Sequence, residues 1–118
     1  MHKIKLHGIQ VRHYAFEEVD EFLGSLDEKT KEKVLYNLWK ARMINDSELF
    51  KKLTNEIWEF RTRFIGNQIR LLAFMDKNSK QPKIVVCTHG LVKKTNKTPK
   101  SDIEKAEDIK VKYFKGLL

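Results

Sequence analysis

Few residues in this chain could stabilise a fold by any means other than a packed core. It has one cysteine in 118 residues, Cys87, which cannot form an internal disulfide and is expected to pack as a small hydrophobic group. Apolar runs such as residues 71–75 are far shorter than the roughly 20 residues of a membrane span, and the N-terminal segment lacks a signal-peptide core. We therefore expect a single domain, residues 1–118, that is cytoplasmic and has no membrane contact.

Sequence motifs for metal and cofactor binding are also missing. A single cysteine cannot complete a zinc site, and metal-ligand spacing is absent among His2, His7, His13 and His89. The chain has no glycine-rich phosphate loop and no nucleophile-elbow sequence. We therefore predict no metal and no cofactor. Only His89 follows an apolar run and directly precedes a lysine cluster; its usual role there is structural, although an imidazole can also transfer a proton near neutral pH.

Positive charge is abundant, but only in the second half of the chain. Residues 1–50 contain 8 Lys+Arg and 9 Asp+Glu, a net charge of −1, whereas residues 51–118 contain 16 and 7, a net charge of +9. Clustered cations displace condensed counterions from phosphates, so this asymmetry favours a polyanionic partner for the second half. A lysine-rich solvated surface explains the same numbers equally well.

The beginning of the chain predicts one strand followed by a helical hairpin. Residues 3–13 alternate apolar and polar side chains, with a break at Gly8, as in a first β-strand. Residues 14–26 have apolar side chains three and four apart, and Gly24 is a suitable end for that helix.

A second helix is predicted from about residue 27 to residue 44. Ser25 and Glu28 have the spacing of a capping box, in which each side chain satisfies a free backbone N–H of the other residue. The predicted inner side of this helix consists of Val34, Leu35, Leu38, Trp39 and Arg42.

Three antiparallel strands and a last helix follow. Residues 57–64 alternate cleanly, with Glu59, Arg61 and Arg63 on one side. A turn leads into residues 68–75, and a second turn leads into residues 83–92, whose apolar character predicts a central strand. Ser101 and Glu104 repeat the capping-box spacing at the start of the last helix. We therefore predict an α+β fold: a small, mostly antiparallel sheet made of the first strand and a three-strand meander, with an N-terminal helical hairpin and a C-terminal helix.

Cationic side chains should converge at one end of this sheet. Arg61, Arg63 and Arg70 lie on two neighbouring strands, and a loop rich in lysine leaves the third strand beside them. Two plainer interpretations stay open. Glu59 could form a solvated cross-strand salt bridge with these arginines, worth at most about 1 kcal/mol, and the lysine loop could be a mobile turn.

Two segments resemble the RelE/ParE toxin superfamily, specifically its phage-derived HigB-like branch: KKLTNEIWEFRTRFIGNQIRLLAF and KIVVCTHGLVKKTNKTPKSDIEKAE. That branch has a Glu-x-Arg strand, here Glu59 and Arg61, and then an arginine that opens the next strand, here Arg70. Its last strand ends in His-Gly-aromatic, followed by Lys-Lys-Thr and Lys-Thr-Pro; the matching residues are His89, Gly90, Lys93, Lys94, Thr95, Lys97, Thr98 and Pro99. Leu91 stands where the branch usually has an aromatic residue. The resemblance covers about residues 26–114.

The resemblance implies a RelE-like fold and a toxin of a type II toxin–antitoxin pair that cleaves mRNA, usually on the ribosome. It also implies a cognate antitoxin with a helix-turn-helix DNA-binding domain. Metal-independent cleavage of RNA requires a base for the ribose 2′-hydroxyl, a cation facing the phosphate and an acid for the leaving oxygen. The resulting catalytic candidates are Arg61 and Arg70 for the phosphate and His89, Lys93 and Lys94 for proton transfer. The RNA-binding candidates are Arg63, Lys97 and Lys100.

Two other functions remain compatible with the residues. A ParE-like toxin would inhibit DNA gyrase and leave mRNA intact. A non-catalytic basic RNA-binding module, or a prophage remnant without activity, would bind RNA without cutting it.

Overall fold

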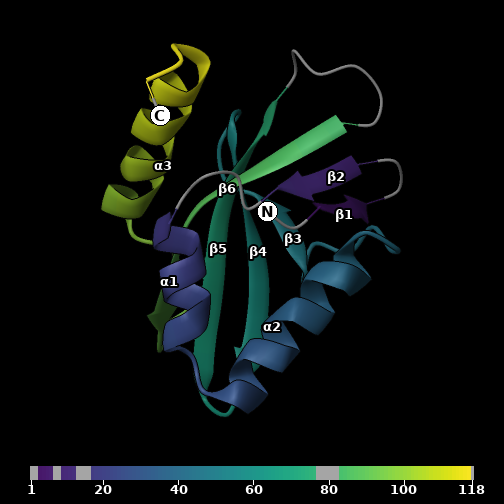
Figure 1. Cartoon of the computed structure of the whole chain (residues 1–118). Helices are drawn as coiled ribbons and strands as arrows, with labels where there is room; N and C mark the ends of the chain where they lie inside the picture. Colours follow the sequence, from purple (N-terminus) through teal and green to yellow (C-terminus); the bar gives the residue numbers. More distant parts are fainter. Residues whose placement is uncertain (1–2, 7–8, 13–16, 77–82, 118) are drawn as a thin grey trace.

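Six strands form one sheet in the computed structural model, which describes residues 3–6, 9–12, 17–76 and 83–117 (Figure 1). The strands are β1 (Lys3–Leu6), β2 (Ile9–Arg12), β3 (Phe50–Lys52), β4 (Ile57–Phe64), β5 (Asn67–Asp76) and β6 (Lys83–Lys93). Their order across the sheet is β1-β2-β6-β5-β4-β3, and all neighbours are antiparallel except the parallel pair β2 and β6. The helices α1 (Glu17–Ser25), α2 (Glu28–Ala41) and α3 (Lys100–Phe114) pack against this sheet, which confirms the predicted α+β class.

The predicted meander is present as β4, β5 and β6, but the rest of the sheet differs from the prediction. The expected single strand at residues 3–13 is an antiparallel pair, in which Leu6 of β1 lies opposite Ile9 of β2. In the sequence, the apolar residues change from even positions in β1 to odd positions in β2. This change of parity indicates that the chain reverses direction between β1 and β2. The sequence does not predict β3, because three residues are too few to show an alternating pattern. The following predictions fall outside the described residues: those for Gly8, His2, His7, His13 and the turn at 77–82.

The capping box predicted at the start of α2 is wrong. Asp27 caps this helix instead, and its carboxylate accepts hydrogen bonds from the backbone N–H (2.8 Å) and hydroxyl (3.0 Å) of Thr30. These bonds lower the pKa of Asp27, because they stabilise its charged form. Ser25 is the last residue of α1 and its hydroxyl donates to the carbonyl of Phe22 (2.6 Å), so Gly24 lies within α1 and does not end it.

The capping box predicted for α3 is also wrong, because the helix begins one residue earlier. Pro99 is the N-cap, and no side chain forms a capping hydrogen bond there. Ser101 therefore lies in the first turn. On the inner side of α3, Ala106 is fully buried, and Ile103, Ile109 and Tyr113 pack against the core.

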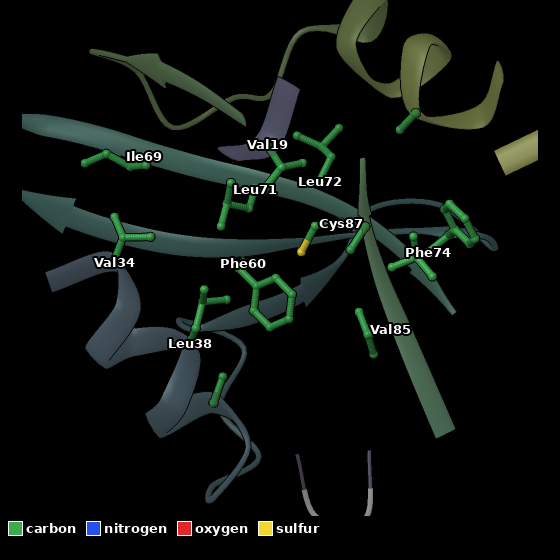
Figure 2. Close-up of a cluster of buried hydrophobic side chains, with 14 of the residues drawn as sticks. Val19, Val34, Leu38, Phe60, Ile69, Leu71, Leu72, Phe74, Val85 and Cys87 are labelled. Carbon is green, nitrogen blue, oxygen red and sulfur yellow. The ribbon is translucent and has the colours of Figure 1, made fainter. Parts of the chain in front are cut away.

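One part of the apolar core lies between α2 and one face of the sheet, and another lies beneath α3 on the opposite face, where Phe74 and Ala106 are fully buried. Figure 2 shows Val34 and Leu38 of α2 directed at β4, where Phe60 is buried. The side-chain amide of Asn37 also donates to the Thr62 hydroxyl (3.2 Å), which fixes this face of β4 as the one that α2 covers. Two other predicted inner residues of α2 are wrong: Leu35 is 37% exposed and Trp39 is 46% exposed. The sequence pattern predicts burial for both residues because their side chains are apolar.

The other two helices cover different parts of the sheet. α1 packs against β6, and α3 packs against the sheet face opposite α2. α1 approaches β6 so closely that a Cβ on Gly90 would lie 2.2 Å from a ring carbon of Phe22, so only glycine fits there. Phe74 of β5 points away from the α2 side and meets the ring of Tyr113 of α3 edge-on at 5.2 Å between centroids. In the part of the chain that the structure describes, no helix is long and apolar enough to cross a membrane.

Candidate functional site

Charged and polar side chains of three neighbouring strands share the sheet face opposite α2. The antiparallel register places Arg61 directly opposite Arg70, and Gln68 between Arg63 and Lys93. Because residues paired across antiparallel strands point to the same side, strand alternation gathers these groups on one surface. We call this surface the cation face; its residues are Glu59, Arg61, Arg63, Gln68, Arg70, His89 and Lys93.

Glu59 holds the two central arginines together. Its Oε2 atom lies 3.4 Å from Nε of Arg61, and its Oε1 atom lies 3.5 Å from Nε of Arg70. The Glu59 side chain is 2% exposed and that of Arg70 is fully buried, so this is a buried ion-pair cluster and not a solvated cross-strand salt bridge. Like charges placed directly opposite each other repel, and the carboxylate between the two guanidinium groups offsets that repulsion.

The loop after β6 is fastened to this cluster. The hydroxyl of Thr98 donates to Oε1 of Glu59 at 2.5 Å, and Thr98 itself is buried. Nη2 of Arg70 donates to the backbone carbonyl of Asn96 (3.2 Å), and Nη2 of Arg63 donates to the Asn96 side chain (3.2 Å). These bonds fix residues 96–98, which argues against a freely solvated turn.

Four cationic N–H groups on the cation face lack a hydrogen-bond partner in the described part of the protein. They are buried, and they belong to Nε of Arg61, Nε and Nη1 of Arg70, and Nζ of Lys93. Buried polar groups in folded proteins are almost always paired, and each unpaired donor costs about 1–3 kcal/mol. Nε of Arg61 and Nε of Arg70 still lie within ion-pair distance of the Glu59 carboxylate, whereas Nη1 of Arg70 and Nζ of Lys93 have neither a hydrogen bond nor an ion pair with it. Converging cationic donors that make no hydrogen bond are what an anion with several oxygens, such as a phosphate, would satisfy. This arrangement identifies the cation face as the candidate functional site.

The surroundings of Lys93 disfavour its charged form relative to that of an exposed lysine. Burial lowers the pKa of Lys93, and the positive charge of Arg70 lowers it further, while Glu59 opposes the shift. Burial also lowers the pKa of Arg70, but an arginine stays protonated near neutral pH. Among the lysines predicted for the site, Lys93 therefore has the clearest physical reason to act as a base.

His89 lies on the same face but is engaged within the protein. Its Nε2 is 3.1 Å from Oδ1 of Asp102 on α3, and its Nδ1 is 3.0 Å from the Thr88 hydroxyl. Burial lowers the pKa of His89, and the hydrogen bond to Asp102 opposes that shift. In the neutral form, a proton on Nε2 allows this atom to donate to Asp102, and the Thr88 hydroxyl beside Nδ1 donates to the Leu72 carbonyl (3.3 Å). This pairing connects β6 to α3 and leaves neither ring nitrogen directed at the arginines.

The other predicted lysines lie around the site and not in it. Lys94 is exposed, and its Nζ donates to the Asn67 side chain (2.7 Å). Lys97 is exposed in the loop, and Lys100 is exposed at the start of α3, where its Nζ is 4.0 Å from Glu104. The structure thus brings Arg61, Arg63, Arg70 and Lys93 together and leaves these three lysines at the surface.

Several residues of the site were not among the sequence-based candidates. Glu59 and Thr98 belong to the motifs that carry the family resemblance, but the sequence alone assigns neither of them a role in the site, although the parity of Glu59 with Arg61 in an alternating strand indicates a shared face. Asn96 has no local signal, because its role depends on contacts with residues far away in the chain. Among the residues that the structure describes, no group of three or more His, Cys, Asp or Glu could hold a metal ion.

Comparison with known families agrees with this arrangement. The model of the family described as phage-derived protein Gp49-like (DUF891) matches residues 21–110. The chain belongs to the Gp49-like family. This family is part of the RelE/HigB-like toxin group, so the resemblance seen in the sequence is confirmed at that level. The Gp49-like match includes every residue of the cation face and the whole loop from β6 to α3. No match was found among curated proteins or solved structures.

Proposed function

We propose that this Gp49-like protein is the toxin of a toxin–antitoxin pair and an endoribonuclease that cuts mRNA, with the ribosome as its site of action. The observation that carries the proposal is the set of four buried cationic N–H groups on Arg61, Arg70 and Lys93 that make no hydrogen bond. Family membership supports a toxin, and the predicted RelE-like fold is one on which RNA cleavage is the expected chemistry.

In this proposal the two arginines hold the scissile phosphate. Guanidinium groups are planar and permanently charged, and paired N–H groups can bind two phosphate oxygens at once. Nη1 of Arg70 makes no hydrogen bond and Nε lies 3.5 Å from Glu59, whereas Nη2 is already bound to Gln68 and Asn96. The positive charge of the two guanidinium groups would stabilise the negative charge that develops on the phosphate in the transition state.

Lys93 is the proposed base. Its neutral amine takes the proton of the ribose 2′-hydroxyl, the resulting oxygen attacks the phosphorus, and the bond to the 5′ oxygen breaks. A 2′,3′-cyclic phosphate remains on one product, and the leaving 5′ oxygen receives a proton from an acid. Both ring nitrogens of His89 are bound within the protein, which favours the exposed Lys94 as that acid.

Access to the donors requires a change in the loop. The four N–H groups have almost no solvent contact, and Asn96 and Thr98 hold the loop against Arg70 and Glu59. A phosphate can therefore reach Arg70 only when residues 96–98 move, and phosphate oxygens would then replace the Asn96 carbonyl as acceptors. The positive charge of the second half of the chain would guide RNA to this region.

A cognate antitoxin with a helix-turn-helix DNA-binding domain is the proposed partner during growth. The net charge of +9 over residues 51–118 supports a partner with an acidic segment. Co-expression of the two proteins should suppress growth arrest and give a complex that copurifies at moderate salt. Arrest that continues in the presence of the co-expressed partner would contradict this assignment.

The proposal is tested by primer extension on a reporter mRNA in a reconstituted translation reaction, with and without ribosomes. The wild type should produce new 5′ ends within codons, and Lys93→Gln should lower the cleavage rate about 100- to 10,000-fold. Lys115→Gln is the control, since Lys115 is exposed at the C-terminal end of α3, outside the cation face and the loop after β6. Intact mRNA with inhibited gyrase would favour a ParE-like toxin, and RNA binding without new ends would favour a simple binding module; either result overturns the proposal.

A further inference from the structure

The solvent side of α2 carries a cluster of large apolar side chains. We call Leu35, Tyr36, Trp39 and Met43 the outer α2 face; they are 37%, 51%, 46% and 51% exposed, respectively. Single exposed apolar residues are normal on protein surfaces. Here, however, Leu35, Trp39 and Met43 follow one another at intervals of four, which places them in a row along the helix and the turn after it. Grouped exposure of this kind is typical of an interaction site.

The fold does not account for this row. Val34 and Leu38 on the other side of α2 pack against β4 and contribute to the core. The helix therefore has two apolar sides, and folding buries one of them. The rings of Tyr36 and Trp39 lie 5.9 Å apart between centroids, and Nζ of Lys33 lies 5.4 Å from the Tyr36 ring, so the outer face has a connected aromatic centre. Trp and Tyr are the residues most enriched where protein partners bind tightly.

The backbone of α2 restricts the shape of a partner. The N–H and C=O groups within a helix are bonded to each other, so no partner can add a strand here. Contact must come from side chains that fill the spaces along the row. A second helix is suited to this, because its own side chains at intervals of three and four fit between those at Leu35, Trp39 and Met43.

Charge around the outer α2 face indicates the chemistry of that partner helix. Lys33, Lys40 and Arg42 lie within this stretch, and residues 33–45 contain no acidic residue. The acidic residues of α2 are confined to its first two turns, at Glu28 and Glu32. A second copy of this chain would bring the same lysines against each other, with a net charge of +8 on each copy. The complementary surface is therefore apolar and bordered by carboxylates.

We propose that the outer α2 face binds an amphipathic, acidic helix of a partner protein. Leu35, Trp39 and Met43 form the apolar contact, and Lys33 and Lys40 pair with carboxylates at its rim. This binding site is independent of RNA cleavage, because α2 covers the Phe60 and Thr62 side of β4 and the cation face lies on the other side.

The experiment selects binders to the full-length protein from a phage-displayed library of amphipathic helical peptides of about 16 residues. The apolar positions are fixed, and the flanking positions vary among Asp, Glu, Lys, Arg and Gln. We expect the selected peptides to be enriched in Asp and Glu. Trp39→Glu should weaken their binding about 30-fold or more, and the pair Lys33→Glu with Lys40→Glu should reverse the charge preference. Val111→Glu is the matched control, since Val111 is 49% exposed on α3 and should have no effect.

Three results would overturn the proposal. One is enrichment of basic or neutral peptides, and another is binding that Trp39→Glu leaves unchanged. The third is a concentration-dependent dimer of the protein that Trp39→Glu dissociates, because it would identify a second copy as the occupant. Circular dichroism of each variant shows whether it is folded, and a change at an exposed position should leave the fold intact.

Discussion

The two faces of β4 are made from alternate residues of one strand and differ in almost every physical property. Phe60 and Thr62 point to α2, where the contacts are apolar and the Thr62 hydroxyl has a partner. Glu59 and Arg61 point the other way, into a buried cluster of charges in which several donors have no partner. One face therefore stabilises the fold, whereas the other holds charged groups at an energetic cost.

This difference explains where function should be sought. Burying a charge costs several kcal/mol unless pairs and hydrogen bonds satisfy it completely. Glu59, Gln68 and Asn96 satisfy the arginines only in part. An anion that binds the remaining N–H groups would recover that energy, which is the physical basis of the proposed phosphate site.

The largest stability effect is expected on the apolar face. Phe60→Ala removes a ring that is buried between β4 and α2, so it should lower the free energy of unfolding by about 3–5 kcal/mol. Urea denaturation followed by circular dichroism measures this change. A loss below about 1 kcal/mol would show that the contact between α2 and the sheet is not a main source of stability.

A smaller loss of stability is expected when the charge of Glu59 is removed. Glu59→Gln keeps the size of the side chain but leaves Arg61 and Arg70 without a counter-ion, so the free energy of unfolding should fall by about 3 kcal/mol. Glu104→Gln is the control, since Glu104 is exposed. If both variants were equally stable, the carboxylate would have no part in holding the arginines.

Acid should destabilise the protein through His89. Burial lowers its pKa in the folded state, so below the unfolded value of about 6.5 the unfolded chain binds more protons than the folded one. The free energy of unfolding should therefore fall as the pH falls through that value, by up to about 1.4 kcal/mol per pH unit, until the folded-state pKa is reached. His89→Gln should flatten this part of the profile, and an unchanged slope would contradict the assignment.

The smallest change in stability, and the sharpest contrast with Phe60→Ala, is expected for Arg70→Met. The variant replaces a buried cation by an apolar side chain of similar length. Removing one partner of a buried ion pair usually costs about 3–5 kcal/mol because the other charge is left uncompensated, but here the Glu59 carboxylate still has a second cation, Arg61, beside it. We expect the free energy of unfolding to stay within about 1 kcal/mol of the wild type, because Glu59 keeps Arg61 and Thr98 as partners. A large loss would show that Arg70 is structural.

Local patterns predicted the features that depend on neighbouring residues. The alternation in β4 correctly separated Glu59 and Arg61 from Phe60, and the antiparallel meander then placed Arg70 beside Arg61. Helix caps were less predictable, because several polar residues near a helix start compete for the same N–H groups, as Ser25 and Asp27 do at α2.

Features that depend on distant residues could not be predicted in this way. Thr98 bonds to Glu59 across 39 positions in the chain, and Asn96 bonds to Arg70 across 26. No periodicity connects such residues. Trp39 was predicted to be buried and is 46% exposed. An apolar residue at helical spacing indicates burial, but the spacing does not distinguish burial within the fold from burial against a partner.

The most direct test of the cation face is cleavage of a reporter mRNA by Arg70→Met, measured by primer extension in the same translation reaction as the wild type. Its unfolding curve, recorded on the same preparation, shows whether the variant is folded. We predict a folded protein that produces no new mRNA ends, while Lys115→Gln cuts like the wild type. A folded Arg70→Met that cleaves at the wild-type rate would contradict the claim that this face binds the scissile phosphate.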